Sequence, residues 1–533
     1  MNGHANGVAG APEEYDVVII GSGISGINSA QRIKTQAPPG TTYTILESRA
    51  DMGGTWNFFK YPGIRSDSDL HTFGFPWRPW KSNRTIADGP SIMKYMRECA
   101  ESEGIDKKIR FNHKVTDAAW DSNKLKWTLT VDVHGQQRTF IARFLILGTG
   151  YYDYEEPMKT VIPGLENFKG KVIHPQFWPE DYDYTGKNIG IIGSGATAVT
   201  ILPVISEKAK NVTLIQRSPS YVLSIPQDDA LAGFYRRFLP TVMADKIDRI
   251  RHIMEGYILF YLCRAFPNAA RKILLWLSQK QLPKHISVDP HFMPSYNPWE
   301  QRLCLCPNGD FYKGLRRGNC HIVTGTIKTV TEKGILMNSG ETLNFDTIVT
   351  ATGLKLKLAG GVRFTIDGKS LNVGDKFMWK GVMLQDLPNT AFVVGYTNAS
   401  WTLGAEATAQ MVVRLLGDMK RSGYVAAVPR LNNPENMPST PMLNLNSTYI
   451  KNALTVMPKA GAVGQWKPRS NYISDLREAK RGDLITDLEF YAEGDVQGVV
   501  KKVGKAPPKA VARKEAKKIE DQDKQTLLNT AQV

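Results

Sequence analysis

The chain has 533 residues, of which 42% are apolar and 22% charged, and its formal net charge is +16. This length exceeds one ordinary core, so we expect two or three domains with the composition of a soluble globular protein. Five scattered cysteines without a Cys-x-x-Cys pair favour a reducing compartment and argue against a disulfide or zinc framework, so no metal site is predicted.

The two ends of the chain have their own character. Residues 1–13 are rich in Gly, Ala and Asn without an apolar signal segment, and we interpret them as a disordered leader of a cytoplasmic protein. Residues 499–533 form a basic tail, with eight Lys/Arg against one Glu in 501–518. We interpret the tail as disordered and solvated; the alternative is a weak contact with a membrane surface, and no nucleic-acid partner is expected.

A βαβ unit follows the leader. The apolar run 15–20 predicts a buried strand, GSGISG at Gly21 to Gly26 predicts a nucleotide-binding turn, and 41–47 predicts a second strand. Gly21 allows the tight turn, Gly23 allows backbone to approach a pyrophosphate, and Gly26 allows the helix to pack on the strand. Glu47 lies at the spacing of the acid that binds a ribose hydroxyl, so this unit predicts a dinucleotide site.

A second unit repeats the pattern with one informative change. Residues 188–192 predict a strand, GSGATA (Gly193 to Ala198) predicts a turn, and 211–217 predicts the next strand. This strand ends in Gln216 and Arg217 instead of an acid. An arginine there suits a 2′-phosphate, which favours NADPH over NADH; the alternative is a solvated arginine at a strand end.

The order of strands predicts an α/β fold in which the second dinucleotide-binding (Rossmann-like) domain is inserted into the first. Strands expected at 144–150 and 345–353 leave the two domains in turn. We therefore expect a first domain from 14–160 and 355–498 and a second from 161–354. Helical periodicity over about 224–296 predicts a helical insertion whose apolar faces are mostly core, with a substrate tunnel as the alternative.

Three further motifs carry a family resemblance. Residues 168–179 read FKGKVIHPQFWP, residues 53–67 read GGTWNFFKYPGIRSD, and residues 297–311 read NPWEQRLCLCPNGDF. With them the chain resembles the type I Baeyer–Villiger monooxygenases from about Tyr15 to Tyr491. RSDSDLHTFGF and GYTNASWTL make the branch of thioamide-activating enzymes the most similar one.

The resemblance implies FAD in the first domain and NADPH in the second. It also implies a reaction: one atom of O2 is inserted next to a ketone carbonyl through a flavin 4a-peroxide, giving an ester or lactone. The alternative is oxygenation of sulfur or nitrogen in small molecules, as in simple flavin-containing monooxygenases. A non-oxygenating flavoprotein that binds its partner through the basic tail is the rival from another class.

Roles for individual residues follow from the same resemblance. Arg302 would stabilise negative charge at the reacting centre and Asp67 would hold Arg302, a simple salt bridge being the alternative. His174 would act through domain movement and cofactor sensing, or serve only structure. Gln301 stands where many relatives have a lysine, which leaves Arg217 as the main support for NADPH. The expected cofactor contacts are Gly21, Gly23, Ser25, Gly26, Glu47, Gly54, Thr55, Trp56, Arg65, Asp67, Val115, Gly193, Ser194, Gly195, Ala196, Thr197, Ala198, Gln216 and Arg217.

Overall fold

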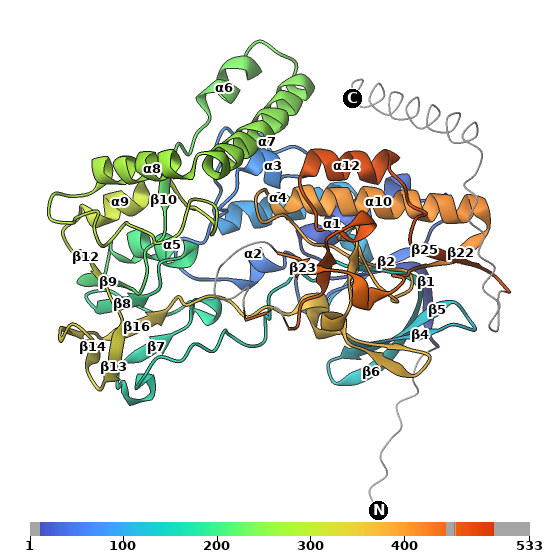
Figure 1. Cartoon of the computed structure of the whole chain (residues 1–533), viewed down its shortest axis with the longest axis horizontal. Helices are drawn as coiled ribbons and strands as arrows, with labels where there is room; N and C mark the ends of the chain where they lie inside the picture. The colour runs from blue at the N-terminus through green and yellow to red at the C-terminus, as the bar shows by residue number, and fades with distance from the viewer. Residues whose placement is uncertain (1–10, 444–451, 454, 495–533) are drawn as a thin grey trace, which may run out of the picture.

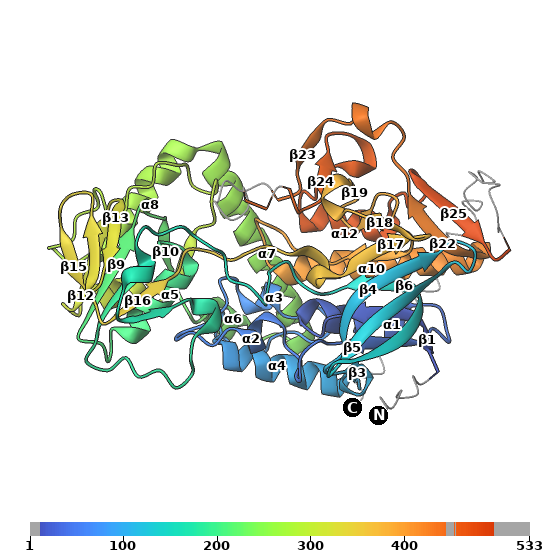
Figure 2. The ribbon, with the colours of Figure 1, turned by 90° about the horizontal axis from the view of Figure 1, so that it is seen from below.

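The structure is a computed structural model, and it describes residues 11–443, 452–453 and 455–494. The basic tail and all but the last residues of the predicted leader therefore lie outside the described residues. Two sheets, one mixed and one parallel, lie toward opposite ends of the molecule (Figures 1 and 2). In Figure 1 most of the helices lie along one side of them. The predicted α/β fold with two Rossmann-like units is confirmed.

The first sheet is built around β1, which pairs in parallel with β2 on one side and β6 on the other. β1 begins at Glu13, two residues earlier than predicted, and its last four residues are buried. Both faces of this sheet are covered by apolar clusters, as expected for β-branched runs in a parallel sheet. Its strands are β1 (Glu13–Ile20), β2 (Tyr43–Leu46), β3 (Ile109–Arg110), β4 (Lys114–Asp121), β5 (Lys126–Val133), β6 (Gln136–Leu147), β17 (Arg363–Ile366), β18 (Lys369–Leu371), β19 (Met378–Trp379), β20 (Met383–Leu384) and β21 (Thr390–Phe392).

Helices α1 and α10 pack together against this sheet, although they come from opposite ends of the chain (Figure 1). α1 begins directly after Gly23, and α4 is capped by Asp88, whose carboxylate accepts the backbone N–H of Ser91. The helices of this domain are α1 (Ile24–Gln36), α2 (Thr55–Phe58), α3 (Leu70–Phe73), α4 (Gly89–Ser102), α10 (Trp401–Ser422) and α12 (Tyr472–Arg481). Two small antiparallel pairs complete it: β22 (Tyr424–Pro429) with β25 (Leu488–Ala492), and β23 (Ser439–Pro441) with β24 (Lys459–Gly461).

The second sheet has five parallel strands in the order β12-β9-β8-β16-β7. A smaller antiparallel sheet, β13-β14-β15, and helices α5 and α9 accompany it. The elements are β7 (Lys171–Ile173), β8 (Asn188–Ile192), α5 (Ala196–Ile205), β9 (Asn211–Gln216), β10 (Val222–Ile225), β11 (Cys304–Pro307), α9 (Asp310–Leu315), β12 (Cys320–Thr324), β13 (Ile327–Thr331), β14 (Gly334–Met337), β15 (Thr342–Asn344) and β16 (Thr347–Thr350).

The path of the chain between the sheets bears on the proposed domain bounds. The chain leaves the first sheet after β6, forms the whole second sheet, and returns to the first at β17. This crossing supports the proposed divisions near residues 160 and 354.

The helical insertion contains α6 (Ala230–Arg236), α7 (Thr241–Ala265) and α8 (Pro267–Gln281). The expectation that its apolar faces are mostly core is wrong for α7. Only five of its side chains are buried, two of them the aspartates Asp245 and Asp248, while its isoleucines and leucines lie at least partly exposed. The physical reason is that the inward side of α7 is polar. It forms ion pairs with Arg236 and Asp229, and its Arg249 donates to the carbonyls of His71 and Gly74 in the first domain. Over the described part of the chain, no helix is long and apolar enough to cross a membrane.

Candidate functional site

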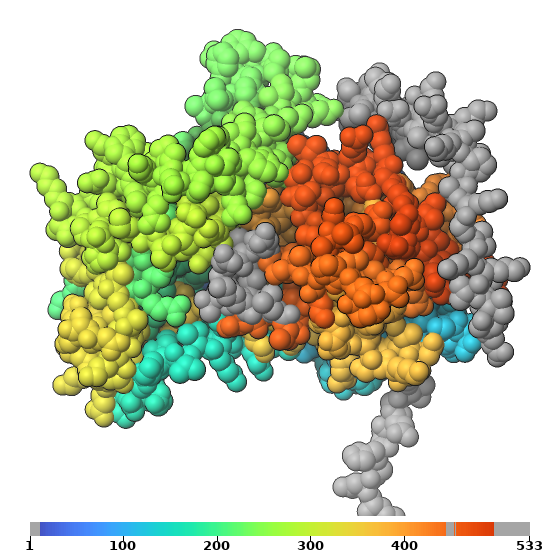
Figure 3. Space-filling view, in the orientation of Figure 1, coloured from blue at the N-terminus to red at the C-terminus, as the bar shows by residue number. Residues whose placement is uncertain are grey.

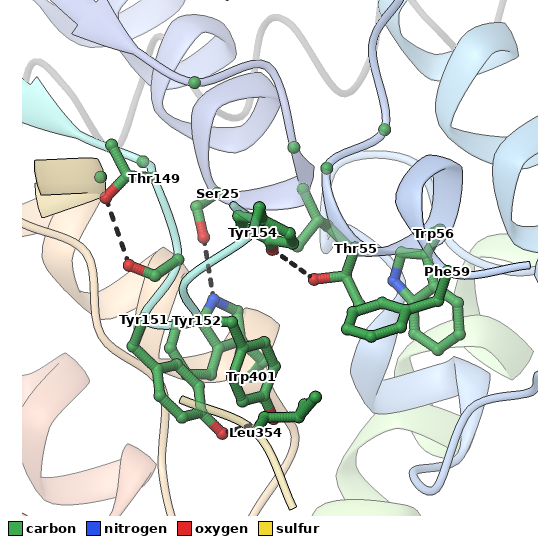
Figure 4. A pocket seen from close by; sticks show the side chains of 18 of the residues that line it. Ser25, Thr55, Trp56, Phe59, Thr149, Tyr151, Tyr152, Tyr154, Leu354 and Trp401 are labelled. Atoms are coloured by element: carbon green, nitrogen blue, oxygen red, sulfur yellow. Dashed lines mark hydrogen bonds between the residues drawn. The ribbon is translucent and has the colours of Figure 1, made fainter. Parts of the chain in front are cut away.

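A cavity of about 610 Å³ is lined by both dinucleotide-binding units. Its walls come from the first glycine turn, the loops around residues 47–68 and 148–155, and the start of α5. Figure 4 shows part of this lining, including Ser25, Thr55 and Thr149. This volume is within the range of small-molecule and cofactor pockets. The predicted site residues on its walls are Gly21, Gly23, Ser25, Glu47, Gly54, Thr55, Trp56, Arg65, Asp67, Val115, Ala196, Thr197 and Arg302.

The first glycine turn has the close approaches that its sequence predicts. A side chain on Gly26 would place its Cβ 1.9 Å from the carbonyl oxygen of Gly21, so only glycine lets α1 pack this near the strand. Gly23 is different, because the nearest atom to an added Cβ is Cα of Gly54 at 3.6 Å. Gly23 and Gly54 thus face each other beside the cavity, and the N-terminus of α1 opens there. Free N–H groups and the helix dipole make this a place for a phosphate.

Glu47 closes the first unit, as predicted from its spacing. It lies just beyond β2, is 6% exposed, and lines the cavity. Its Oε2 accepts hydrogen bonds of 2.8 Å from the backbone N–H and the hydroxyl of Ser22, so the turn itself fixes the carboxylate. Carboxylate oxygens accept more than one hydrogen bond each, so Glu47 retains capacity for the hydroxyls of a ribose.

Arg302 and Asp67 meet on the cavity wall. Nη1 of Arg302 lies 3.6 Å from Oδ2 of Asp67, and both side chains are partly exposed. Arg302 stands two residues before β11, whereas Asp67 lies in the loop between α2 and α3 of the first domain. This part of the wall therefore places a permanent cation beside a carboxylate.

Two groups near Arg302 are held neutral. Burial raises the pKa of the Cys304 thiol to about 12, with Asp67 adding to the shift and Arg302 opposing it. Burial also raises the pKa of Tyr61 to about 12, again with a contribution from Asp67. Cys304 and Cys306 are buried on β11, and a thiol with so high a pKa is a poor nucleophile.

Arg65 takes a different partner. Its guanidinium pairs with the Asp310 carboxylate at the start of α9, and a second contact joins Nη2 to Oδ1 at 3.3 Å. Arg65 still lines the cavity, but this ion pair also ties the loop of the first domain to the second domain.

An aromatic wall completes the cavity (Figure 4). Trp401 stacks on Tyr151 with ring centroids 4.9 Å apart, and its indole N–H donates to the hydroxyl of Ser25 at 2.9 Å. Thr55 shares a hydrogen bond of 2.8 Å with the Tyr154 hydroxyl. The sequence analysis quoted the motif GYTNASWTL, which contains Trp401, but missed the tyrosines. The signal was present, since three tyrosines in four positions directly follow the end of a predicted strand.

Trp56 and Trp178 differ in their surroundings. Trp56 packs edge-on against Phe73 with centroids 5.6 Å apart and lines the cavity. Trp178 is 7% exposed and belongs to the apolar cluster of the second domain, so its position is that of a core residue.

The second glycine turn reaches the cavity only through its last part. Ala196 and Thr197, in the first turn of α5, line the cavity, whereas the four other predicted residues of this turn do not. A Cβ on Gly193 would lie 2.2 Å from the carbonyl oxygen of Ala351, while one on Gly195 would meet no atom within 4 Å. Open space at the second glycine is what the approach of a pyrophosphate requires. The four residues outside the cavity lining are Gly193, Ser194, Gly195 and Ala198.

The two residues predicted to contact NADPH at the end of β9, Gln216 and Arg217, have different surroundings. Gln216 is 4% exposed, and its amide donates to the His291 carbonyl at 2.7 Å and to the Thr324 hydroxyl at 3.0 Å. Its side chain is therefore engaged within the fold. Arg217 is exposed directly after the strand, so it is the residue at this edge with a charge available to a phosphate.

His174 lies at the end of β7 and does not line the cavity. Its Nδ1 accepts the backbone N–H of Gln176 at 3.2 Å. Burial lowers the pKa of His174, and a hydrogen bond with the backbone of Gly353 opposes this shift. Gly353 lies just before the segment that returns to the first domain, so His174 is placed at the crossing between the domains.

Comparisons with known proteins agree with this geometry. Residues 85–387 match the family described as flavin-binding monooxygenase-like, and residues 19–88 match an NAD(P)-binding Rossmann-like domain. The chain is 44% identical over 466 residues to the FAD-containing monooxygenase EthA of Mycolicibacterium smegmatis, covering 87% of this chain and 94% of EthA. It is 43% identical over 470 residues to a probable FAD-binding monooxygenase, AlmA, of Acinetobacter baylyi, covering 88% and 94%.

Solved structures share the fold at lower identity. A steroid monooxygenase bound to NADP superposes with a TM-score of 0.70 at 21% identity, covering 90% of this chain and 100% of its own. A closed cyclohexanone monooxygenase gives a TM-score of 0.67 at 20% identity, with the same coverage.

Proposed function

Since the chain belongs to the flavin-binding monooxygenase-like family, we propose that it is an NADPH-dependent Baeyer–Villiger monooxygenase containing FAD. It would insert one atom of O2 next to the carbonyl of a small-molecule ketone to give an ester or lactone. Family membership makes the chain a flavoprotein monooxygenase; the ketone reaction is the proposal. The observation that carries it is the Arg302–Asp67 pair on the wall shared with the first glycine turn.

The first unit has the features that FAD requires. The turn offers backbone N–H groups beside Gly23, where no side chain obstructs a pyrophosphate, and Glu47 offers a fixed carboxylate to a ribose. Thr55, Trp56 and Val115 would border the remainder of the cofactor. When bound, the flavin supplies hydride acceptance from NADPH and the activation of O2, chemistry that no side chain provides.

The second unit is suited to NADPH. The first turn of α5 borders the same cavity, so a nicotinamide held by this unit is within reach of the first site. Arg217 supplies an exposed cation for the 2′-phosphate at the end of β9. His174, at the crossing between the domains, would respond to domain movement and cofactor binding.

Arg302 would stabilise charge during the attack on the substrate. A ketone oxygen becomes negative when its carbonyl carbon is attacked, and a preorganised cation in a partly enclosed site lowers the energy of that state. Asp67, whose Oδ2 lies 3.6 Å from Nη1 of Arg302, would hold the guanidinium in place. The aromatic wall would limit access of water.

An isotope experiment tests the ketone reaction. Purified protein would be supplied with NADPH, ¹⁸O₂ and a panel of cyclic and linear ketones, and products would be examined by mass spectrometry. We expect one heavy oxygen atom in the ester. If thioethers were oxygenated and ketones were not, heteroatom oxygenation would be the activity and the proposed ketone reaction would be wrong. Formation of hydrogen peroxide without either product would contradict a monooxygenase.

A further inference from the structure

The helical insertion presents an unusual apolar surface. Among the described residues, 15 of the 23 exposed large apolar side chains lie between Leu231 and Trp276, which is 46 of 533 residues. They cover α6, α7 and α8, which form one edge of the molecule, with α6 standing away from the body (Figures 1 and 3). We call this set the α6–α8 face. We infer that the α6–α8 face docks on an anionic lipid bilayer.

Helix α7 is inverted relative to a helix that packs on a core. Its inward side carries Asp245 and Asp248, which pair with Arg236 at 3.5 and 2.8 Å. Its outward side carries Ile250, Ile258 and Leu262, which are 62%, 53% and 52% exposed. Helices on globular proteins normally turn their apolar stripe inward, because burial of apolar area is the favourable term. The outward stripe of α7 therefore fits an apolar medium outside the protein.

The neighbouring helices extend the same surface. Phe234 and Phe238 are 65% and 69% exposed around α6, and Trp276 is 56% exposed on α8. Phenylalanine, leucine and tryptophan on one face with cations beside them are typical of helices that lie in the plane of a membrane interface. The finding that no described helix spans a membrane is compatible with this mode, which buries only one face.

Charge determines which medium suits this face. Arg237, Lys246, Arg264, Lys272 and Lys280 are exposed along it. The acids of the three helices are two buried aspartates and Glu255, which is already paired with Arg251 at 2.8 Å. Exposed cations around an apolar face complement the negative surface of a bilayer with anionic lipids.

A second copy of the chain suits the face less well. A two-fold dimer would use the same face on both subunits, so its cations would approach the cations of the partner. Glu255 is the single exposed acid of the three helices and could not offset five cations. Like charges brought together at an interface are destabilising, whereas lipid phosphates would neutralise them.

The face also adjoins the elements that enclose the cavity. Tyr257 of α7 packs with Tyr396, which lines the cavity. Leu274 of α8 packs with Leu303, the residue after Arg302. Docking through these helices would place the cavity next to the bilayer.

Vesicle flotation tests the inference directly. Full-length protein would be mixed with vesicles of phosphatidylcholine, alone or with phosphatidylglycerol. We expect the protein to float with the anionic vesicles. The double variant Ile250→Glu/Ile258→Glu should bind these vesicles at least about tenfold more weakly, because it puts acids into the apolar stripe. Because both isoleucines are exposed, flavin content and circular dichroism should not change.

Two matched controls separate this face from other surfaces. The double variant Val161→Glu/Ile473→Glu places the same acids at exposed apolar positions elsewhere, where the side chains are 92% and 54% exposed, and should bind like the natural protein. The variant with Lys501, Lys502, Lys505 and Lys509 changed to Gln reduces the charge of the basic tail and should also keep binding.

Three results would overturn the inference. The first is absence of flotation of the natural protein with anionic vesicles. The second is a tail variant that no longer floats while Ile250→Glu/Ile258→Glu floats like the natural protein. The third is a dimer in sedimentation equilibrium that Ile250→Glu/Ile258→Glu dissociates while vesicles are not bound, which would assign the face to a second copy.

Discussion

Arg302 and Asp67 are joined by a contact of 3.6 Å between Nη1 and Oδ2, and neither side chain is fully buried. Exposed ion pairs contribute only about 0–1 kcal/mol to the free energy of unfolding. The pair is therefore better explained by what it does in the cavity than by stability, and its removal should leave a folded protein.

We expect Arg302→Ala to lower ester formation by about 100-fold or more, the usual loss when one charge-stabilising donor is removed. NADPH should still bleach the flavin, and the thermal midpoint should change little. Stopped-flow absorbance and product analysis would measure the two steps separately, and Arg302→Lys would show how much a cation alone restores. Ester formation within about twofold of the natural rate would contradict the role given to Arg302.

The first glycine turn makes a prediction about cofactor content. Gly23 has a φ of −73°, so a side chain there is not strained by the backbone. Gly23→Val should yield protein with little or no flavin, because the branched side chain would extend past Gly54 into the phosphate position.

The matched change is Gly195→Val in the second turn, where an added Cβ meets no atom within 4 Å. We expect this variant to retain flavin and to lose affinity for NADPH. Absorbance spectra of the purified variants would decide the assignment, and equal flavin content in the two would refute it.

Arg217 should determine the choice between the two nicotinamide cofactors. Arg217→Ala should raise the KM for NADPH by about tenfold or more, as one charge-assisted contact to a phosphate is lost, and leave the KM for NADH nearly unchanged. Arg138→Ala, at an exposed arginine of β6, serves as the control. Equal effects on both cofactors would show that Arg217 does not contact the 2′-phosphate.

The lowered pKa of His71 leads us to expect that the stability of the protein depends on pH. Burial lowers its pKa to about 4, and the neighbouring His252 adds to the shift, with Arg236 in the same sense and Asp69 and Asp248 opposing it. Between pH 4 and about 6.5, His71 is therefore protonated less in the folded protein than in the unfolded chain. Stability contributed by neutral His71 is present above that range and is lost as the pH falls, by up to about 1.4 kcal/mol per pH unit.

Urea unfolding across this range would measure the effect. His71→Gln should flatten the pH dependence, whereas His285→Gln, at an exposed histidine, should leave it unchanged. Identical slopes for the natural protein and His71→Gln would contradict a buried neutral histidine.

Local patterns in the sequence determined the two dinucleotide units. Strand, glycine turn, helix and terminal residue follow one another within about 30 residues, and each step depends on steric and hydrogen-bonding rules that act over short distances. The order of strands along the chain also predicted that one sheet is interrupted by the other. Glu47 and the close approach at Gly26 were predictable for the same reason.

Only the tertiary structure decided which distant residues share the cavity. Asp67 and Arg302, and likewise Ser25 and Trp401, are brought together by the packing of loops and helices from separate parts of the chain. It also placed the apolar stripe of α7 outside, although the sequence favoured the core. Helical periodicity identifies an apolar face but not the direction in which it points, because that direction depends on the ion pairs that the opposite face finds in the rest of the molecule.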